Sequence, residues 1–118
     1  MKRVMLPDGI YFVGDPMYVL DKDKWHDKVY LTESIYEPEL RFWHHKTEWG
    51  DGVYYDQNDN RYPVDSASIG VVPIEIWRDT PANITPERLG VVRVFPTEFI
   101  CEYDNGVFKI GVVEIDTG

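Results

Sequence analysis

The sequence predicts a mainly β fold, a compact antiparallel barrel or two-layer β structure with one short helix near residues 22–30. Three observations predict it. Short runs of alternating or continuous apolar residues recur along the chain, Gly, Pro, Asn and Asp separate them, and a single stretch combines helical spacing with a capping residue. The 118 residues contain no linker or internal repeat. We therefore expect one domain over residues 1–118, which is long enough to bury roughly two thirds of its unfolded surface.

The first elements follow from residues 9–30. Residues 9–14 are apolar between two glycines and predict a strand, which Asp15-Pro16 interrupts because proline lacks an amide donor. Extended structure is expected to resume over residues 17–20. Asp21 is then a good N-cap for a helix from Lys22 to about residue 30, since Asp accepts hydrogen bonds from the first free amides of a helix.

The middle of the chain predicts further short strands. Residues 40–44 alternate as a strand does, and residues 52–55 and 61–64 flank a polar tip that is typical of a hairpin loop. Residues 68–77 predict a mostly buried strand. A connecting loop over residues 80–89, with one helical turn near Thr85-Pro86-Glu87, leads to a strand at residues 90–95.

The last twenty-one residues predict a hairpin whose register is defined. Asn105-Gly106 is the strongest short-range hairpin signal, because both residues tolerate the positive φ of a type I′ turn. This loop places Glu102 opposite Lys109 on a solvated face. Beyond Gly111 the apolar parity switches, which predicts a β-bulge. The apolar pairs on the buried face are Tyr103 with Phe108, Cys101 with Ile110, and Phe99 with Val112.

The net charge of −9 argues against direct binding to the nucleic-acid backbone, which requires a cationic face. The acidity is uneven: residues 1–46 carry a net charge of −1 and residues 47–118 a net charge of −8. A basic or metallic partner suits the second stretch better than the first, although excess acidic residues also simply solvate a surface.

Cys101 is the only cysteine, and its place on the inward face of the hairpin predicts a small core residue rather than a nucleophile. The chain shows no signal-peptide pattern at its start and no apolar run long enough to span a membrane. We therefore expect a soluble, cytoplasmic protein that does not bind membranes.

Four aspartates next to glycines or turns are candidate metal ligands: Asp15, Asp51, Asp65 and Asp116. A β scaffold can bring carboxylates from separate turns together, and Mg²⁺ or Ca²⁺ prefers such oxygen ligands. The alternative is that each aspartate accepts hydrogen bonds from the backbone of its own turn, with no cofactor bound. The three histidines lack partners for a zinc site, and we expect them at the surface. No catalytic triad is recognisable.

Aromatic side chains concentrate between residues 43 and 62, where they could stack on a nucleotide-like ligand or anchor a protein partner. Strand alternation sends about half of them into the core instead, and Tyr54 and Tyr55 must face opposite ways. Together with the aspartates, these residues make up the predicted ligand- or partner-binding set: Asp15, Tyr18, Trp43, Trp49, Asp51, Tyr54, Tyr62 and Asp65.

Four segments carry a resemblance: residues 14–19, 49–54, 62–66 and 111–118. In this order they resemble a family of small uncharacterised phage and bacterial proteins with the motifs Gly-Asp-Pro-Cys-Tyr, Tyr-Gly-Asp-Gly-x-Tyr, Tyr-x-Val-Asp and a closing Ile-Asp-Thr. The resemblance implies a phage or bacterial origin and no particular activity. Met17 and Trp49 depart from the motifs, in which Cys and Tyr are usual.

Three functions are compatible with these features. The first is a non-enzymatic binding protein, a phage or bacterial accessory factor that inhibits a host protein or sequesters a small ligand. The second is a metal-dependent hydrolase that uses the aspartates. The third is a structural or assembly module. The acidic composition, the aromatic residues and the missing catalytic set favour the first, and the oligomeric state stays open.

Overall fold

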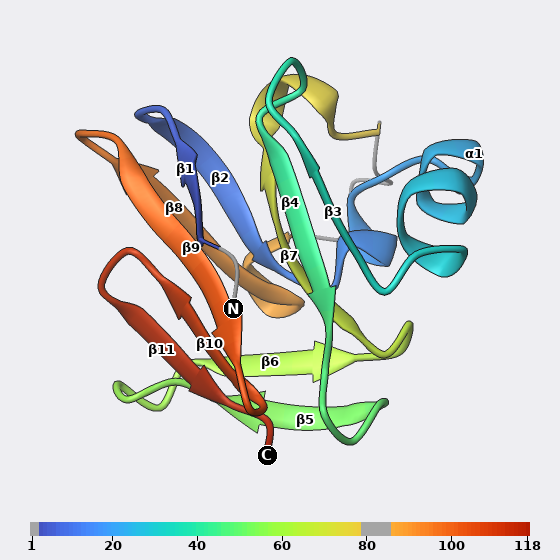
Figure 1. The fold of residues 1–118 in the computed structure, drawn as a ribbon, viewed down its shortest axis with the longest axis vertical. Helices are drawn as coiled ribbons and strands as arrows, with labels where there is room; N and C mark the ends of the chain where they lie inside the picture. Colours follow the sequence, from blue (N-terminus) through green and yellow to red (C-terminus); the bar gives the residue numbers. More distant parts are fainter. Residues whose placement is uncertain (1–2, 79–85) are drawn as a thin grey trace.

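The computed structural model describes residues 3–78 and 86–118, which form mainly antiparallel β structure with one short helix (Figure 1). The four-stranded sheet has the order β1 (Arg3–Leu6), β9 (Phe99–Asp104), β10 (Val107–Ile110) and β11 (Val113–Asp116). The five-stranded sheet has the order β3 (Ser34–Glu37), β4 (Phe42–Lys46), β7 (Ser68–Pro73), β2 (Gly9–Gly14) and β8 (Gly90–Phe95). The hairpin of β5 (Gly52–Tyr55) and β6 (Arg61–Val64) lies across one end of both sheets in Figure 1. The mainly β prediction is confirmed, as an open two-layer arrangement and not a closed barrel.

The predicted helix begins at the expected cap. The Asp21 carboxylate accepts a hydrogen bond of 2.9 Å from the Lys24 amide, and α1 (Lys22–Trp25) follows and continues as a π-helical turn over His26–Tyr30. No helix in residues 3–78 or 86–118 has the length and apolar character needed to cross a bilayer.

The terminal hairpin has the predicted register as far as Ile110. Asn105 and Gly106 both have positive φ, and Cys101 lies opposite Ile110. The expected bulge and the pairing of Phe99 with Val112 are wrong. Gly111 has φ +58° and starts a turn instead, so that the chain reverses and Ile110 pairs with Val113 of β11. The parity switch in the sequence thus marked a new strand.

Other boundaries differ because proline and side-chain capping outweigh the apolar pattern. Residues 17–20 are not extended: Pro16–Tyr18 forms a 3₁₀ turn capped by Asp15. The buried strand ends at Pro73, and Ile74–Ile76 is a second 3₁₀ turn.

Three further differences concern segments with weak patterns. The strand expected at residues 40–44 lies at Phe42–Lys46, and β1 and β3 were not predicted. Pro86–Arg88 forms the expected helical turn, whereas its predicted cap, Thr85, lies outside the described residues.

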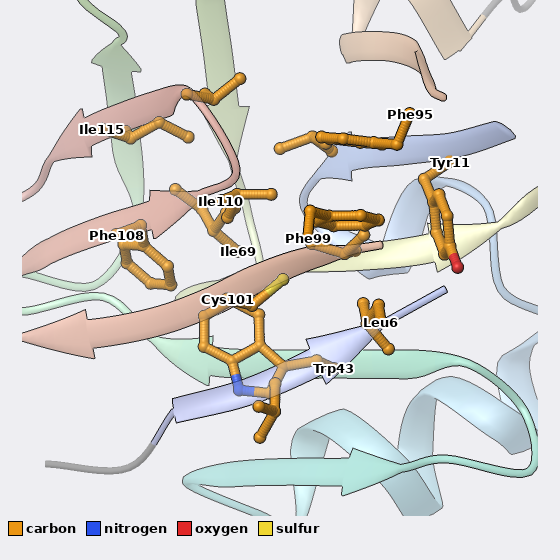
Figure 2. Packing of buried hydrophobic residues seen from close by; sticks show 14 of the residues in the cluster. Leu6, Tyr11, Trp43, Ile69, Phe95, Phe99, Cys101, Phe108, Ile110 and Ile115 are labelled. Atoms are coloured by element: carbon orange, nitrogen blue, oxygen red, sulfur yellow. The ribbon is translucent and has the colours of Figure 1, made fainter. Parts of the chain in front are cut away.

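The main core fills the space between the two sheets. Phe95 and Phe99 stack with ring centroids 3.7 Å apart, and Tyr11 meets both edge-on (Figure 2). Cys101 is buried in the same cluster, as predicted, and burial raises the pKa of its thiol. On the opposite face of the five-stranded sheet, Phe12 and other apolar side chains pack against the helical segments. Because its central strands are buried on both faces, they appear in the sequence as continuous apolar runs.

Two strand pairs cross from one sheet to the other at the same place. β1 leads into β2 through Pro7-Asp8, and β8 leads into β9 through residues 96–98; β1 pairs with β9, and β2 pairs with β8. These two crossings form a corner of the molecule (Figure 1).

Candidate functional site

The Asp15 carboxylate is fully buried and organises the turn at residues 65–67. Its Oδ2 accepts hydrogen bonds of 2.7 Å from the amides of Asp65 and Ser66. Its Oδ1 accepts from the Met17 amide at 2.9 Å and from the Ser66 hydroxyl. Four donors around one buried carboxylate compensate for its desolvation. We call residues 65–67 and the side chains that hold them the Asp15 turn.

Three other predicted or charged residues join this turn. The Tyr18 hydroxyl donates to the Asp65 carboxylate, the Ala67 amide donates to Asp51 Oδ1 at 2.8 Å, and Lys46 Nζ donates to the Ser66 carbonyl at 3.3 Å. The structure therefore brings together four residues of the predicted set, namely Asp15, Tyr18, Asp51 and Asp65. Ser66 and Lys46 complete the group and were not in that set.

Asp116 lies elsewhere, opposite Val107 in the four-stranded sheet, where its Oδ1 accepts a hydrogen bond from the Gly118 amide. Within residues 3–78 and 86–118, no three His, Cys, Asp or Glu side chains are grouped so as to hold a metal ion. At the Asp15 turn both Asp15 oxygens already accept hydrogen bonds from the protein.

The burial of the Asp15 turn changes the acid–base behaviour of its groups. Desolvation raises the pKa of the Asp15 carboxyl, and the hydrogen bonds from Ser66, Met17 and Asp65 act in the opposite direction. Desolvation also lowers the pKa of Lys46 and, together with the Asp65 carboxylate, raises the pKa of Tyr18. The hydrogen bonds donated to Asp15 thus offset part of the cost of burying its carboxylate.

The aromatic residues of the predicted set separate into three environments. Tyr62 is buried, and its hydroxyl donates to Asp56 at 2.7 Å, while Trp43 is 4% exposed. Tyr54 is half-buried and donates to the Gly50 carbonyl. Trp49 alone projects from the surface, with 74% of its area exposed. Core packing therefore explains Trp43 and Tyr62, and only Trp49 is placed as a surface anchor would be.

His44 is not at the surface, contrary to expectation. It is fully buried, with Nε2 2.7 Å from the Thr32 hydroxyl and Nδ1 2.7 Å from the Ser68 hydroxyl. The Thr32 hydroxyl also donates to the Lys28 carbonyl at 2.7 Å and the Ser68 hydroxyl to the His45 carbonyl at 3.2 Å, so each ring nitrogen has a hydrogen-bond partner in either neutral tautomer. Burial, and after it the positive charge of Lys46, lowers the pKa of His44 from its ordinary 6.5 to about 3. The buried ring is therefore neutral.

A group of exposed apolar side chains covers the outside of the corner. Met5 lies opposite Ile100 in the β1–β9 pair, and Ile10 lies opposite Val94 in the β2–β8 pair. Val112, at the neighbouring β10–β11 turn, has 70% of its area exposed. We call these five side chains the apolar corner.

The apolar corner borders a hollow of about 630 Å³. Its lining includes Met5, Val94, Ile100 and Val112, together with the edges of Phe95 and Phe99 and the polar residues Arg93, Thr97 and Glu98. A cavity of this size and composition is typical of a binding site. The sequence carried one signal for it: Ile100 shares its strand face with Glu102, where a polar residue is expected.

A comparison with protein-family models, curated proteins and solved structures finds no match to this chain. The resemblance to small phage and bacterial proteins therefore stays a prediction.

Proposed function

We propose that this chain is a non-enzymatic binding protein that docks a protein partner on its apolar corner. The observation that carries the proposal is the gathering of five large exposed apolar side chains at one corner, four of which line one hollow. A contiguous apolar patch of this kind is costly to leave in water and marks interaction surfaces in soluble proteins. Apolar side chains from a partner would fill the hollow and remove both surfaces from water.

The charge of the chain indicates the chemistry of that partner. The net charge is −9, whereas the hollow itself is lined by Arg93 as well as Glu98, and on the outer face of the four-stranded sheet Glu102 forms an ion pair with Arg3 and lies opposite Lys109. A partner that presents apolar side chains within a basic surface is complementary to the charge of the chain as a whole. The same field would steer its approach and increase the association rate.

A biological role can be proposed for a protein that docks a partner in this way. The resemblance to phage and bacterial proteins favours an accessory factor that acts in the bacterial cytoplasm by inhibiting a host protein. Sequestration of a small ligand is the alternative, because a hollow of about 630 Å³ also suits a small molecule. An assembly module would use the same surface against a second copy of the chain or a larger complex.

A metal-dependent hydrolase is the second candidate function, because Asp15, Asp51 and Asp65 all belong to the Asp15 turn, although within residues 3–78 and 86–118 their carboxylates are not grouped as a set of metal ligands. Mg²⁺ or Ca²⁺ that bound only the native state would raise the melting temperature. A thermal-shift titration with each ion tests this function separately, and Asp116, which lies apart, would have no part in it.

The docking proposal is tested by capture from bacterial lysate with matched variants. Ile100→Asp and Val112→Asp place a charge within the apolar corner, whereas Val53→Asp places the same charge on an exposed position of β5 (43% exposed). We expect one protein to be retained by the wild type and by Val53→Asp, and lost from both corner variants. Equal retention by all four proteins, or retention of nothing, contradicts the proposal.

Two further measurements separate the alternatives. Sedimentation at high concentration detects self-association through the corner, which the assembly reading requires. A Trp49→Ala variant tests whether the exposed indole belongs to the same interface, and loss of the captured protein from this variant alone would move the interface to the β5–β6 side of the molecule.

A further inference from the structure

A second, smaller hollow lies where the two sheets separate at the β3–β4 edge. In the β3–β4 pair Tyr36 lies opposite Trp43 and Ser34 lies opposite His45, so these four side chains share one face. Tyr103 and Val4 of the four-stranded sheet line the other side, and the hollow, which is partly open to solvent, has a volume of about 220 Å³. We call this space the aromatic hollow.

Its walls are aromatic rings held in fixed positions. His45 stacks on Tyr103 with ring centroids 3.7 Å apart, and Tyr103 in turn packs edge-on against Phe108. The Tyr36 hydroxyl donates to the Met5 carbonyl at 3.1 Å across the gap between the sheets. Trp43 is anchored in the core, so that only a small part of it reaches the hollow. A ligand would therefore meet a preformed site.

The charge around the aromatic hollow favours a cation. None of its lining residues is Lys or Arg, and the Glu48 carboxylate accepts a hydrogen bond of 3.0 Å from the Tyr103 hydroxyl. The chain as a whole carries a charge of −9. Aromatic faces attract cations through their quadrupole, most strongly when the cation has left water.

The lining also restricts which cation fits. No carboxylate lines the hollow, so a primary ammonium would leave water without gaining enough acceptors for its three N–H groups. A methylated ammonium has no such requirement and presents methyl groups to the rings. The volume is below the roughly 300–1,000 Å³ of drug-sized sites, and thus suits a small headgroup.

We propose that the aromatic hollow binds a quaternary ammonium headgroup, with the Tyr36 ring, the accessible part of Trp43 and the stacked His45–Tyr103 pair as its cage. Ser34, which also lines the hollow, would contact the polar remainder of the ligand. This site is independent of the apolar corner: in β1, Val4 points to the hollow side and Met5 to the outer side. The headgroup belongs either to a free metabolite or to a trimethylated lysine of a partner.

The first experiment uses the wild-type chain and needs no variant. Tetramethylammonium, choline, a trimethyllysine peptide and 3,3-dimethyl-1-butanol, the neutral isostere of choline, are titrated by calorimetry and by the tryptophan indole resonances in NMR. We expect saturable binding of the cations, with a shift of the Trp43 indole resonance, and no comparable binding of the alcohol. Tighter binding of the peptide than of choline identifies a protein source, and the reverse order identifies a metabolite. Equal binding of choline and its isostere, or no saturable response to any cation, overturns the proposal.

A variant pair locates the site. Tyr36→Phe retains the ring and Tyr36→Leu removes it, while Tyr55→Leu makes the same change on the exposed face of β5. Tyr36→Leu is expected to weaken choline at least about fivefold, with Tyr36→Phe and Tyr55→Leu within about twofold of the wild type. If Tyr36→Leu does not fold, the comparison of choline with its neutral isostere on the wild-type chain still tests the proposal. Unchanged affinity in folded Tyr36→Leu contradicts the cage.

Discussion

The Asp15 turn and the apolar corner show opposite uses of unusual residues in one small fold. At the Asp15 turn a buried carboxylate is surrounded by donors from two segments of the chain, so both of its oxygens have partners within the protein. At the corner, large apolar side chains that pair only with one another across the strands are exposed to water. The aspartates, whose pattern suggested a binding site, therefore stabilise a turn. The apolar corner, which is the surface available to a partner, consists of strand and turn residues without a distinctive motif.

This comparison predicts a large loss of stability at the Asp15 turn. Asp15→Ala leaves the amides of Met17, Asp65 and Ser66 without an acceptor, and since each buried unpaired donor costs about 1–3 kcal/mol, we expect a loss of about 3 kcal/mol or more. Asp51→Ala, which removes an exposed carboxylate with one acceptor role, should cost about 1 kcal/mol. Urea unfolding measures both. Similar losses for the two variants would show that the turn is not centred on Asp15.

The pH dependence of stability tests a neighbouring buried group. Between pH 6.5 and 3 the unfolded chain protonates His44 and the folded chain does not, so the free energy of unfolding decreases as the pH falls. The contribution is about 1.4 kcal/mol per pH unit, or about 2 kcal/mol at pH 5. Asp15 acts in the opposite sense, because its raised pKa lets the folded state take up a proton first.

Comparison with His44→Gln isolates the histidine contribution, since Asp15 is present in both proteins. Below pH 6.5 the wild type should lose about 1.4 kcal/mol of unfolding free energy per pH unit relative to His44→Gln. Above pH 6.5 the difference between the two proteins should stay constant. A constant difference over the whole range would mean that His44 titrates normally in the folded protein.

At the corner, Gly111 is the position where backbone geometry matters. An alanine Cβ there lies 2.9 Å from Phe95 Cε1 and requires φ +58°. We expect Gly111→Ala to cost about 1–2 kcal/mol from backbone strain and from displacement of the Phe95 ring. Gly50→Ala is the control, with φ +78° and its nearest contact 3.9 Å away. Calorimetric unfolding should show a larger loss for Gly111→Ala, and equal losses would mean that the Phe95 contact is relieved at no cost.

The smallest effect on stability is expected from the apolar corner itself. Val112→Asp changes an exposed side chain without a partner in the described part of the chain, so its unfolding free energy should stay within about 0.5 kcal/mol of the wild type. Thermal unfolding checks this. A loss as large as that of Asp15→Ala would show that the corner is part of the core, which would remove the basis of the docking proposal.

Local sequence patterns predicted much of the fold. Asn105-Gly106 placed the last hairpin in register, Asp21 marked the start of the helix, and the glycines at residues 9 and 14 bounded β2. These features depend on the conformational preferences of neighbouring residues. Strands β1 and β3 carried no comparable signal, because each is short and depends on its pairing partner for definition.

The candidate sites depended far more on tertiary structure. The sequence by itself placed Asp15, Tyr18, Asp51 and Asp65 among eight candidate binding residues, since aspartates in turns and clustered aromatic residues can be recognised from local patterns. Only the folded chain decided that these residues bind one another at the turn, that Trp43 and Tyr62 are buried while Trp49 is exposed, and that Met5, Ile10, Val94, Ile100 and Val112 meet at one corner. The physical reason is that strand pairing joins residues up to about a hundred positions apart, and burial is a property of that pairing rather than of any local pattern.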